Sequence, residues 1–135
     1  MKFRVISSRE EIETLRPNEK AVHLAFRASN VDFLNLMQRS PRLQVIQTPP
    51  SYKKTMSNAI GVFLEMQGIK LLEGDVWGHR KDLDEYFTVP DEAVEAIKSM
   101  TQKGATPEEM AKEVQKSARL GTDLIKYIAK TEVTA

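Results

Sequence analysis

Residues 21–48, AVHLAFRASNVDFLNLMQRSPRLQVIQT, decide the expected fold, because two apolar runs flank one amphipathic segment. The runs AVHLAF and LQVIQT are rich in residues that favour strands. Between them, Ser29 and Asp32 have the spacing of a helix capping box, and Pro41 ends the segment. This order predicts a strand, a helix over residues 30–39 and a second strand parallel to the first.

The same alternation continues in both directions from this unit. Residues 2–6, KFRVI, predict an earlier strand, and a short helix is expected to begin near Ser8. On the other side, residues 51–66 predict the longest helix, with Gly68 after its end and a fourth strand over residues 69–72. We therefore expect an α/β fold with a small, mostly parallel sheet of about four strands built from βαβ units.

The pattern changes after Glu73. Residues 74–86 are polar and rich in turn formers, and from Pro90 onward every segment has helical periodicity. Thr106, followed by Pro107 and by Glu109 at the third helical position, is the clearest helix start in the chain. We expect an α/β module over residues 1–88 and a C-terminal three-helix module, similar to a helix-turn-helix, over residues 89–135.

Composition excludes several classes of protein. The 135 residues include 20 Lys and Arg against 19 Asp and Glu, which argues against a general nucleic-acid coat or a polybasic membrane binder. The chain has no Cys, so disulfides, thiol catalysis and thiolate metal sites are excluded. No secretory leader and no apolar run of spanning length is apparent. We expect a cytoplasmic protein with no membrane partner, cofactor or metal.

The carboxyl ends of the expected strands are rich in cations and hydrogen-bond donors, and ligands of open parallel sheets bind there. Lys53 and Lys54 are expected in the first turn of the long helix, where they oppose the helix dipole and a bound anion would relieve the conflict. The alternative is a tolerated, solvated pair of lysines. The candidate ligand- or anion-binding residues are Arg9, Arg27, Ser51, Tyr52, Lys53, Lys54, Thr55, Asp75, Trp77, His79 and Arg80.

The polar segment after the fourth strand has two interpretations. Glu73, Asp75 and His79 could form a metal site or an acid/base set, although Gly74 and Gly78 prevent a simple helical placement. The alternative is a surface loop that carries the single Trp and packs over the sheet edge. The catalytic residues, if there are any, stay unknown at this point.

The C-terminal module also has two interpretations. A helix-turn-helix would bind DNA, and the candidate DNA-binding residues are Lys112, Lys116, Arg119, Lys126 and Lys130. The connection over residues 115–121 looks longer than the turn of that motif, and residues 89–135 carry seven basic and eight acidic side chains. The alternative is a helical bundle for packing or dimerisation.

The segments MKFRVISSREEIETLRPNEKAVHLAF, SYKKTMS and LLEGDVWGHRKD together resemble an uncharacterised family of small archaeal proteins found in methanogens. The resemblance covers nearly the whole chain, and residues 72–82 are its most specific part. It implies a cytoplasmic, archaeal source and carries no catalytic residues over to this sequence. The C-terminal segment separately resembles helix-turn-helix regulators, which is an analogy of fold.

The leading hypothesis is a non-enzymatic regulatory or binding protein. Its α/β module would sense a small anion or a partner, and its helical module would bind DNA as a transcriptional regulator or mediate assembly, with a homodimer as the expected form. The first alternative is an enzyme acting on a phosphorylated or carboxylated small metabolite, with Asp75 or His79 as acid/base. The second is a structural dimerisation module.

Overall fold

The computed structural model describes residues 2–75, 85–116 and 120–134, and it contains a five-stranded sheet in the order β4-β3-β2-β1-β5. The strands are β1 (Lys2–Ile6), β2 (Ala21–Leu24), β3 (Val45–Thr48), β4 (Lys70–Glu73) and β5 (Tyr86–Thr88). The helices are η1 (Arg9–Thr14, a 3-10 helix), α1 (Asn30–Arg39), α2 (Pro50–Lys53), α3 (Asn58–Met66), α4 (Asp91–Gln102), α5 (Pro107–Val114) and α6 (Thr122–Thr134).

Strands β1 to β4 are parallel, and each lies beside the strand that follows it in the sequence. The βαβ prediction is therefore confirmed for this part of the chain. Because parallel crossovers are right-handed, this order places η1, α1 and α3 on one face of the sheet. There Phe33 and Leu36 of α1 and Leu64 of α3 share a buried core with Val22 and Ile46.

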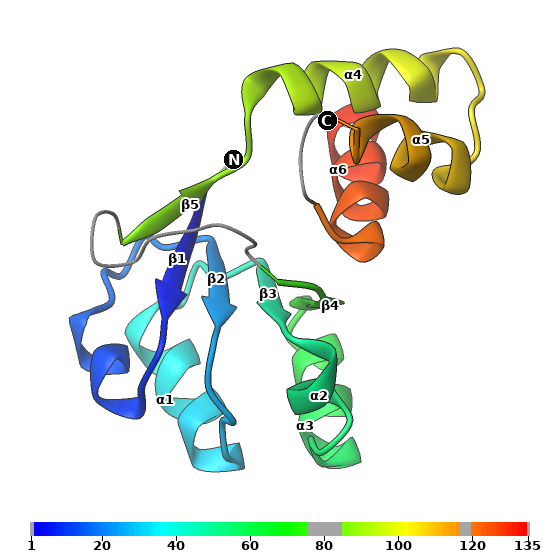
Figure 1. The fold of residues 1–135 in the computed structure, drawn as a ribbon. Coiled ribbons are helices and arrows are strands. Elements are labelled where there is room, and N and C mark those ends of the chain that lie inside the picture. Colours follow the sequence, from blue (N-terminus) through cyan, green and yellow to red (C-terminus); the bar gives the residue numbers. More distant parts are fainter. Residues whose placement is uncertain (1, 76–84, 117–119, 135) are drawn as a thin grey trace.

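The opposite face of the sheet is covered in part, near the amino ends of the parallel strands, by a unit made of α4, α5 and α6, which we call the helical unit. Its side chains share one core with the sheet, in which Ile97, Leu124 and Ile125 belong to the same cluster as Phe3 and Leu72. In Figure 1 the arrows of β1, β2 and β3 point toward the lower end of the view, and the helical unit lies toward the upper end, near the amino ends of these strands.

The sheet is mixed, which corrects the expectation of a mostly parallel sheet of about four strands. The fifth strand, β5, runs antiparallel to β1 and pairs Phe87 with Phe3. The sequence pattern did not predict it, because three residues are too few to establish an alternation of apolar and polar side chains. Its role is to lead the chain from the sheet edge into α4.

The expected long helix over residues 51–66 is also wrong in its bounds, because the structure divides it into α2 and α3. Ser57 is the residue that starts α3, since its hydroxyl accepts a hydrogen bond from the Ile60 N–H at 3.2 Å. The expected caps at Ser29 and Thr106 are confirmed, and each hydroxyl accepts a hydrogen bond from the third residue of its helix. Apolar periodicity continued through residues 51–66, but the cap at Ser57 starts a separate helix.

Candidate functional site

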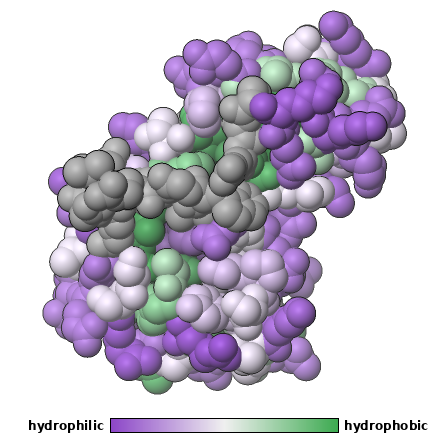
Figure 2. Space-filling view, viewed as in Figure 1, coloured by the Kyte–Doolittle hydropathy of each residue, from purple (hydrophilic) through white to green (hydrophobic). Residues whose placement is uncertain are grey.

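The helical unit is the first candidate site. Its three helices pack around Ala93, Ile97, Met110, Val114 and Leu124, all buried. Exposed lysines form two short rows, in which the members lie one helical turn apart. These lysines are Lys112 on α5 with Lys116 just after its end, and Lys126 with Lys130 on α6. In the view of Figure 2, hydrophilic residues cover most of the outer surface of this unit.

One flank of α6 is docked on the end of β4. The Asp123 carboxylate accepts a hydrogen bond from the Glu73 N–H at 2.9 Å. This backbone amide of the edge strand β4 therefore has a hydrogen-bond partner outside the sheet. At Gly121, a Cβ atom would lie 3.2 Å from the Glu73 carbonyl oxygen and 3.3 Å from the Gly74 Cα, so only glycine allows this close approach without a shift. The row Thr122, Lys126 and Lys130 stays exposed beside this contact.

The carboxyl edge of the parallel strands is the second candidate site, and the structure brings three of its predicted residues together. The Arg27 guanidinium donates a hydrogen bond to the Thr55 hydroxyl at 2.6 Å and lies 5.4 Å from the centroid of the Tyr52 ring. The Ser57 hydroxyl lies 3.0 Å from the Asn30 side-chain oxygen, which joins the starts of α3 and α1. The residues that follow β2 and β3 therefore form one polar cluster.

The expected position of Lys53 and Lys54 is wrong. Lys53 is in the last turn of α2 and Lys54 caps that helix at its C-terminal end. Cations are favourable at a C-terminus, so these lysines do not oppose the dipole and need no anion for that reason. Ser51 lies in α2 and is exposed. An anion at this edge would therefore be bound by Arg27, Tyr52 and Thr55 and not by a helix N-terminus.

Asp75 lies over the face of the sheet that the helical unit covers. Its Oδ1 is 3.7 Å from Nε2 of His23, and its carbonyl oxygen accepts a hydrogen bond from the Gln47 side chain at 3.2 Å. His23 and Gln47 are both fully buried, and a Cβ at Gly74 would lie 2.5 Å from Gln47 Nε2. Asp75 thus contacts two central strands, β2 through its carboxylate and β3 through its carbonyl oxygen. Sequence reasoning did not predict this contact.

The enzymatic alternative would need Asp75 in one pocket with the cations Arg27 and Lys53, but these residues have different neighbours in the described part of the chain. Asp75 faces His23, Arg27 binds Thr55, and Lys53 lines a groove beside α3. Trp77, His79 and Arg80, and Arg119 of the helical unit, lie outside the described residues. Within the described residues, no group of three His, Asp or Glu side chains could hold a metal ion, and no helix has the length and apolar character needed to cross a membrane.

Arg9, one of the predicted anion-binding residues, is bound to Asp32 in the first turn of α1. Its Nε donates a hydrogen bond to Asp32 Oδ1 at 2.7 Å, while Asp32 Oδ2 accepts from the Ser29 N–H at 2.8 Å. Burial alone would raise the pKa of Asp32, but the hydrogen bonds from Arg9 and Ser29 outweigh burial and hold this pKa below its usual value. The pKa of Arg9 is raised by the same bond.

Asp32→Asn is expected to lower the free energy of unfolding at pH 7 by about 1 kcal/mol, the usual worth of a capping interaction. Because the pKa of Asp32 is lower in the folded state, its contribution is present above the unfolded pKa of about 4 and is lost as the pH falls through the folded value. Urea unfolding at neutral and acidic pH measures this loss. Glu65→Gln, at an exposed position of α3, is the control, and a difference that stays constant with pH would contradict the assignment.

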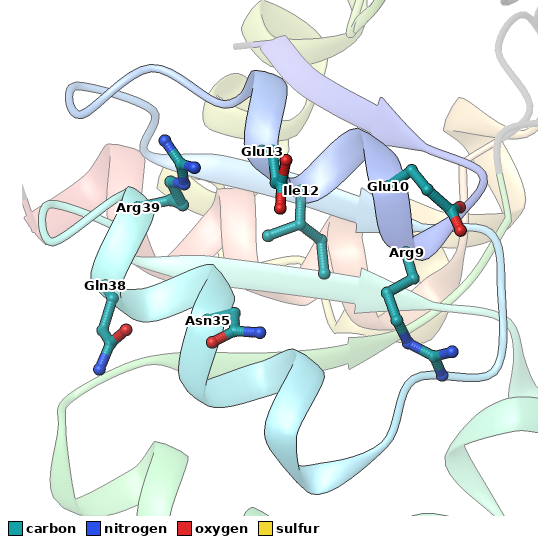
Figure 3. Close-up of a pocket in the computed structure, with 7 residues that line it drawn as sticks. All are labelled: Arg9, Glu10, Ile12, Glu13, Asn35, Gln38 and Arg39. Atoms are coloured by element: carbon teal, nitrogen blue, oxygen red, sulfur yellow. The ribbon is translucent and has the colours of Figure 1, made fainter.

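A groove of 620 Å³ runs between η1 and α1, and Figure 3 shows Arg9 and Arg39 at its opposite ends with Asn35 between them. Glu10 and Glu13 of η1 also line it. Its charges are mixed, so it has no clear preference for an anion. Of this set, sequence reasoning named only Arg9. The polar spacing of residues 35, 38 and 39 on one face of α1 was the pattern that could have indicated it.

The helical unit defines the class of this protein: an α/β sheet module joined to a C-terminal domain of helix-turn-helix type. One family model, described as "Family of unknown function (DUF1699) N-terminal domain", matches residues 2–85, and a second, "Protein of unknown function (DUF1699) C-terminal HTH domain", matches residues 92–130. The chain belongs to the DUF1699 family. No curated protein and no solved structure matches it.

Proposed function

We propose that this protein is a DNA-binding regulator in which the helical unit contacts DNA and the α/β part senses a small anion or a partner. The single observation that supports this most is the C-terminal domain of helix-turn-helix type, with its three helices packed on a common core. In such domains one helix enters the major groove while other parts contact the backbone.

The exposed row on α6 is the proposed surface for the groove. Lys126 and Lys130 lie one turn apart, and Thr122 begins the same row one turn earlier. The flank formed by Asp123 and Tyr127 is directed toward the sheet, since Asp123 binds β4 and Tyr127 packs on the shared core. This leaves a narrow row for DNA, which favours phosphate contacts over extensive reading of base edges.

The lysines beside α5 extend the proposed surface. Lys116 pairs with Glu113 at 3.2 Å, but both side chains are exposed, and such a pair is worth less than about 1 kcal/mol. A DNA phosphate can therefore replace Glu113 at little cost. Arg119 belongs to the same proposed set on the basis of its place in the sequence, between Lys116 and α6.

Acidic residues restrict how DNA can approach. Asp91, Glu92 and Glu95 are exposed on α4, and Glu108 and Glu109 are exposed at the start of α5. Phosphates are repelled from these positions, so the favourable approach is over α6 and the end of α5. This arrangement accounts for a DNA-binding module whose net charge is not positive, because the placement of charge matters more than the sum.

Fluorescence anisotropy with labelled genomic DNA fragments across a salt series tests the proposal. The full chain is compared with a variant in which Lys112, Lys116, Lys126 and Lys130 are all changed to Gln. If each lysine contacts one phosphate, the slope of log K against log salt is expected to become shallower by roughly 3 to 4, since each contact contributes about −0.9.

The matched control carries the same loss of charge on the α/β part, outside the proposed anion sensor, through Arg16→Gln, Lys20→Gln, Arg42→Gln and Lys70→Gln, all at exposed positions. It is expected to keep both the affinity and the slope of the wild type. Absence of binding by the wild type at low salt, or equal losses in the two variants, would exclude the helical unit as the DNA-binding surface.

The proposal has further parts that rest on the sequence. The cluster of Arg27, Tyr52 and Thr55 is the proposed anion sensor, together with the other predicted residues of that edge. We place the protein in the cytoplasm of an archaeon, as the resemblance to methanogen proteins implies.

A homodimer would present two helical units to two half-sites, about one helical turn of DNA apart. Sedimentation of the free protein and of its DNA complex measures this stoichiometry.

A further inference from the structure

The beginning of α6 is the part of the helical unit that lies against the end of β4. Asp123, in the first turn of α6, accepts its hydrogen bond from the Glu73 N–H, and a Cβ at Gly121 would lie 3.2 Å from the Glu73 carbonyl oxygen. In Figure 1 the lower, orange end of α6 lies just above β3 and β4. The α/β part therefore occupies the space beside the first turn of this helix.

The same end of α6 is the one that DNA would need. In a helix-turn-helix, the N-terminal residues of the second helix contact base edges in the major groove. With α5 and α6 as the two helices of the motif, the residues nearest the groove would be Thr122, Asp123 and Lys126. Thr122 and Lys126 are exposed, but Asp123 is bound to the sheet. A duplex seated on this end of α6 would meet the end of β4.

The contact between α6 and the sheet is not equally well packed along the helix. Near the beginning of α6, Leu124 shares a buried core with Leu72 of β4. Toward the second half, a cavity of 270 Å³ lies between α6 and the amino ends of the strands, and Val45 and Tyr127 are among its lining residues. Side chains that line a cavity lack contacts that a filled interior provides, so α6 is held less firmly than in a close-packed interface.

We infer that the α/β part is an autoinhibitory block: the docking of α6 on β4 keeps the beginning of this helix out of the major groove, and full DNA binding requires its release. The docked protein would still contact phosphates through Lys126 and Lys130, and release would add contacts with base edges. This inference rests on the proposed DNA-binding function and names how that surface is regulated. A ligand of the α/β part that binds only the released form would increase DNA affinity by shifting the population.

Loosening the docking without changing any charge tests the inference. Leu72→Ala removes a side chain of the shared core that is 7% exposed, and Gly121→Ala places a Cβ against the Glu73 carbonyl oxygen. The apparent Kd for DNA is the Kd of the released form divided by the released fraction. Each variant is therefore expected to lower the Kd for labelled genomic DNA fragments by about fivefold or more, measured by fluorescence anisotropy at low salt.

Two controls separate release from general destabilisation. Leu36→Ala creates a cavity on the opposite face of the sheet and is expected to leave the Kd unchanged. Combining Gly121→Ala with the loss of the four lysines of the helical unit is expected to remove the gain, because the same surface binds the DNA. Circular dichroism at the temperature of the DNA measurement shows whether each variant is folded.

Hydrogen exchange of single backbone amides, followed by NMR, tests the release in the wild type without any substitution. The Glu73 amide is expected to exchange roughly tenfold faster or more in the DNA complex, because it loses its hydrogen bond to Asp123. The Lys70 amide donates to the Gln44 carbonyl oxygen at 3.0 Å within the sheet, and it is expected to keep its protection.

Several results would overturn the inference. These are a Kd that is unchanged or higher in both Leu72→Ala and Gly121→Ala, a gain of the same size in Leu36→Ala, or a Glu73 amide that stays protected in the DNA complex. Each of them leaves the proposed function standing when the wild type binds DNA. Absence of DNA binding by the wild type and by both docking variants would overturn the proposed function as well.

Discussion

Arg4→Met is expected to lower the free energy of unfolding by about 3–5 kcal/mol, because it leaves a buried carboxylate without its cation. Arg4 is 4% exposed and Glu19 is 8% exposed, and Arg4 Nη1 lies 3.7 Å from Glu19 Oε2. Arg4 also donates a hydrogen bond to the Thr14 hydroxyl at 2.7 Å. Urea unfolding at neutral pH, followed by circular dichroism, measures the loss.

Two further variants separate charge from packing in the Arg4 result. Glu19→Gln in the Arg4→Met background removes the unpaired buried charge and keeps an oxygen that can accept the hydrogen bond from the Tyr86 hydroxyl. The double variant is therefore expected to recover most of the lost stability. Arg42→Met, at an exposed position, is expected to change stability by less than about 0.5 kcal/mol. If the double variant is as unstable as Arg4→Met, the unpaired charge is not the cause.

Leu124→Ala is expected to cost about 2–5 kcal/mol and to destabilise the sheet along with the helical unit. Leu124 is 1% exposed and belongs to the same core as Phe3 and Leu72, so a cavity there lies between the two layers. Because the core is shared, a single unfolding transition is expected in both wild type and variant. Calorimetry gives the number of transitions, and far-UV circular dichroism gives their midpoints.

Leu36→Ala provides the comparison on the opposite face of the sheet, where Leu36 is fully buried against β2 and β3 side chains. It is expected to shift the same transition by a similar amount. Two separate transitions, with Leu124→Ala moving only one of them, would show that the helical unit and the sheet fold independently. The shared core matters for the proposed function, because it fixes which side of α6 stays exposed.

The repeating units of the sheet were predictable because their information is local. Residues 21–48 carry strand, cap, amphipathic helix and strand in order, and the capping box at Ser29 forms as expected. The break between α2 and α3 was not predicted, because the apolar spacing continues across it. β5 was missed because its three residues gain their role only by pairing with β1.

The candidate sites were predictable only where the expected topology placed residues at one edge. Arg27, Tyr52 and Thr55 were predicted at the carboxyl ends of neighbouring strands, and the structure brings them into contact. Contacts that join distant segments were not predicted. Asp123 on the Glu73 amide connects positions fifty residues apart, and no local pattern indicates such a pair.

The sequence by itself determined the parallel β1–β4 units, three C-terminal helices and a surface without strong net charge, because periodicity, caps and composition act over a few residues. Only the tertiary structure decided that the helical unit packs on the free face of the sheet and that Arg4 and Glu19 meet in the interior. The physical reason is that burial of apolar surface stabilises any well-packed pair of surfaces. Which surfaces meet therefore depends on the shapes of the assembled elements, and no single segment determines it.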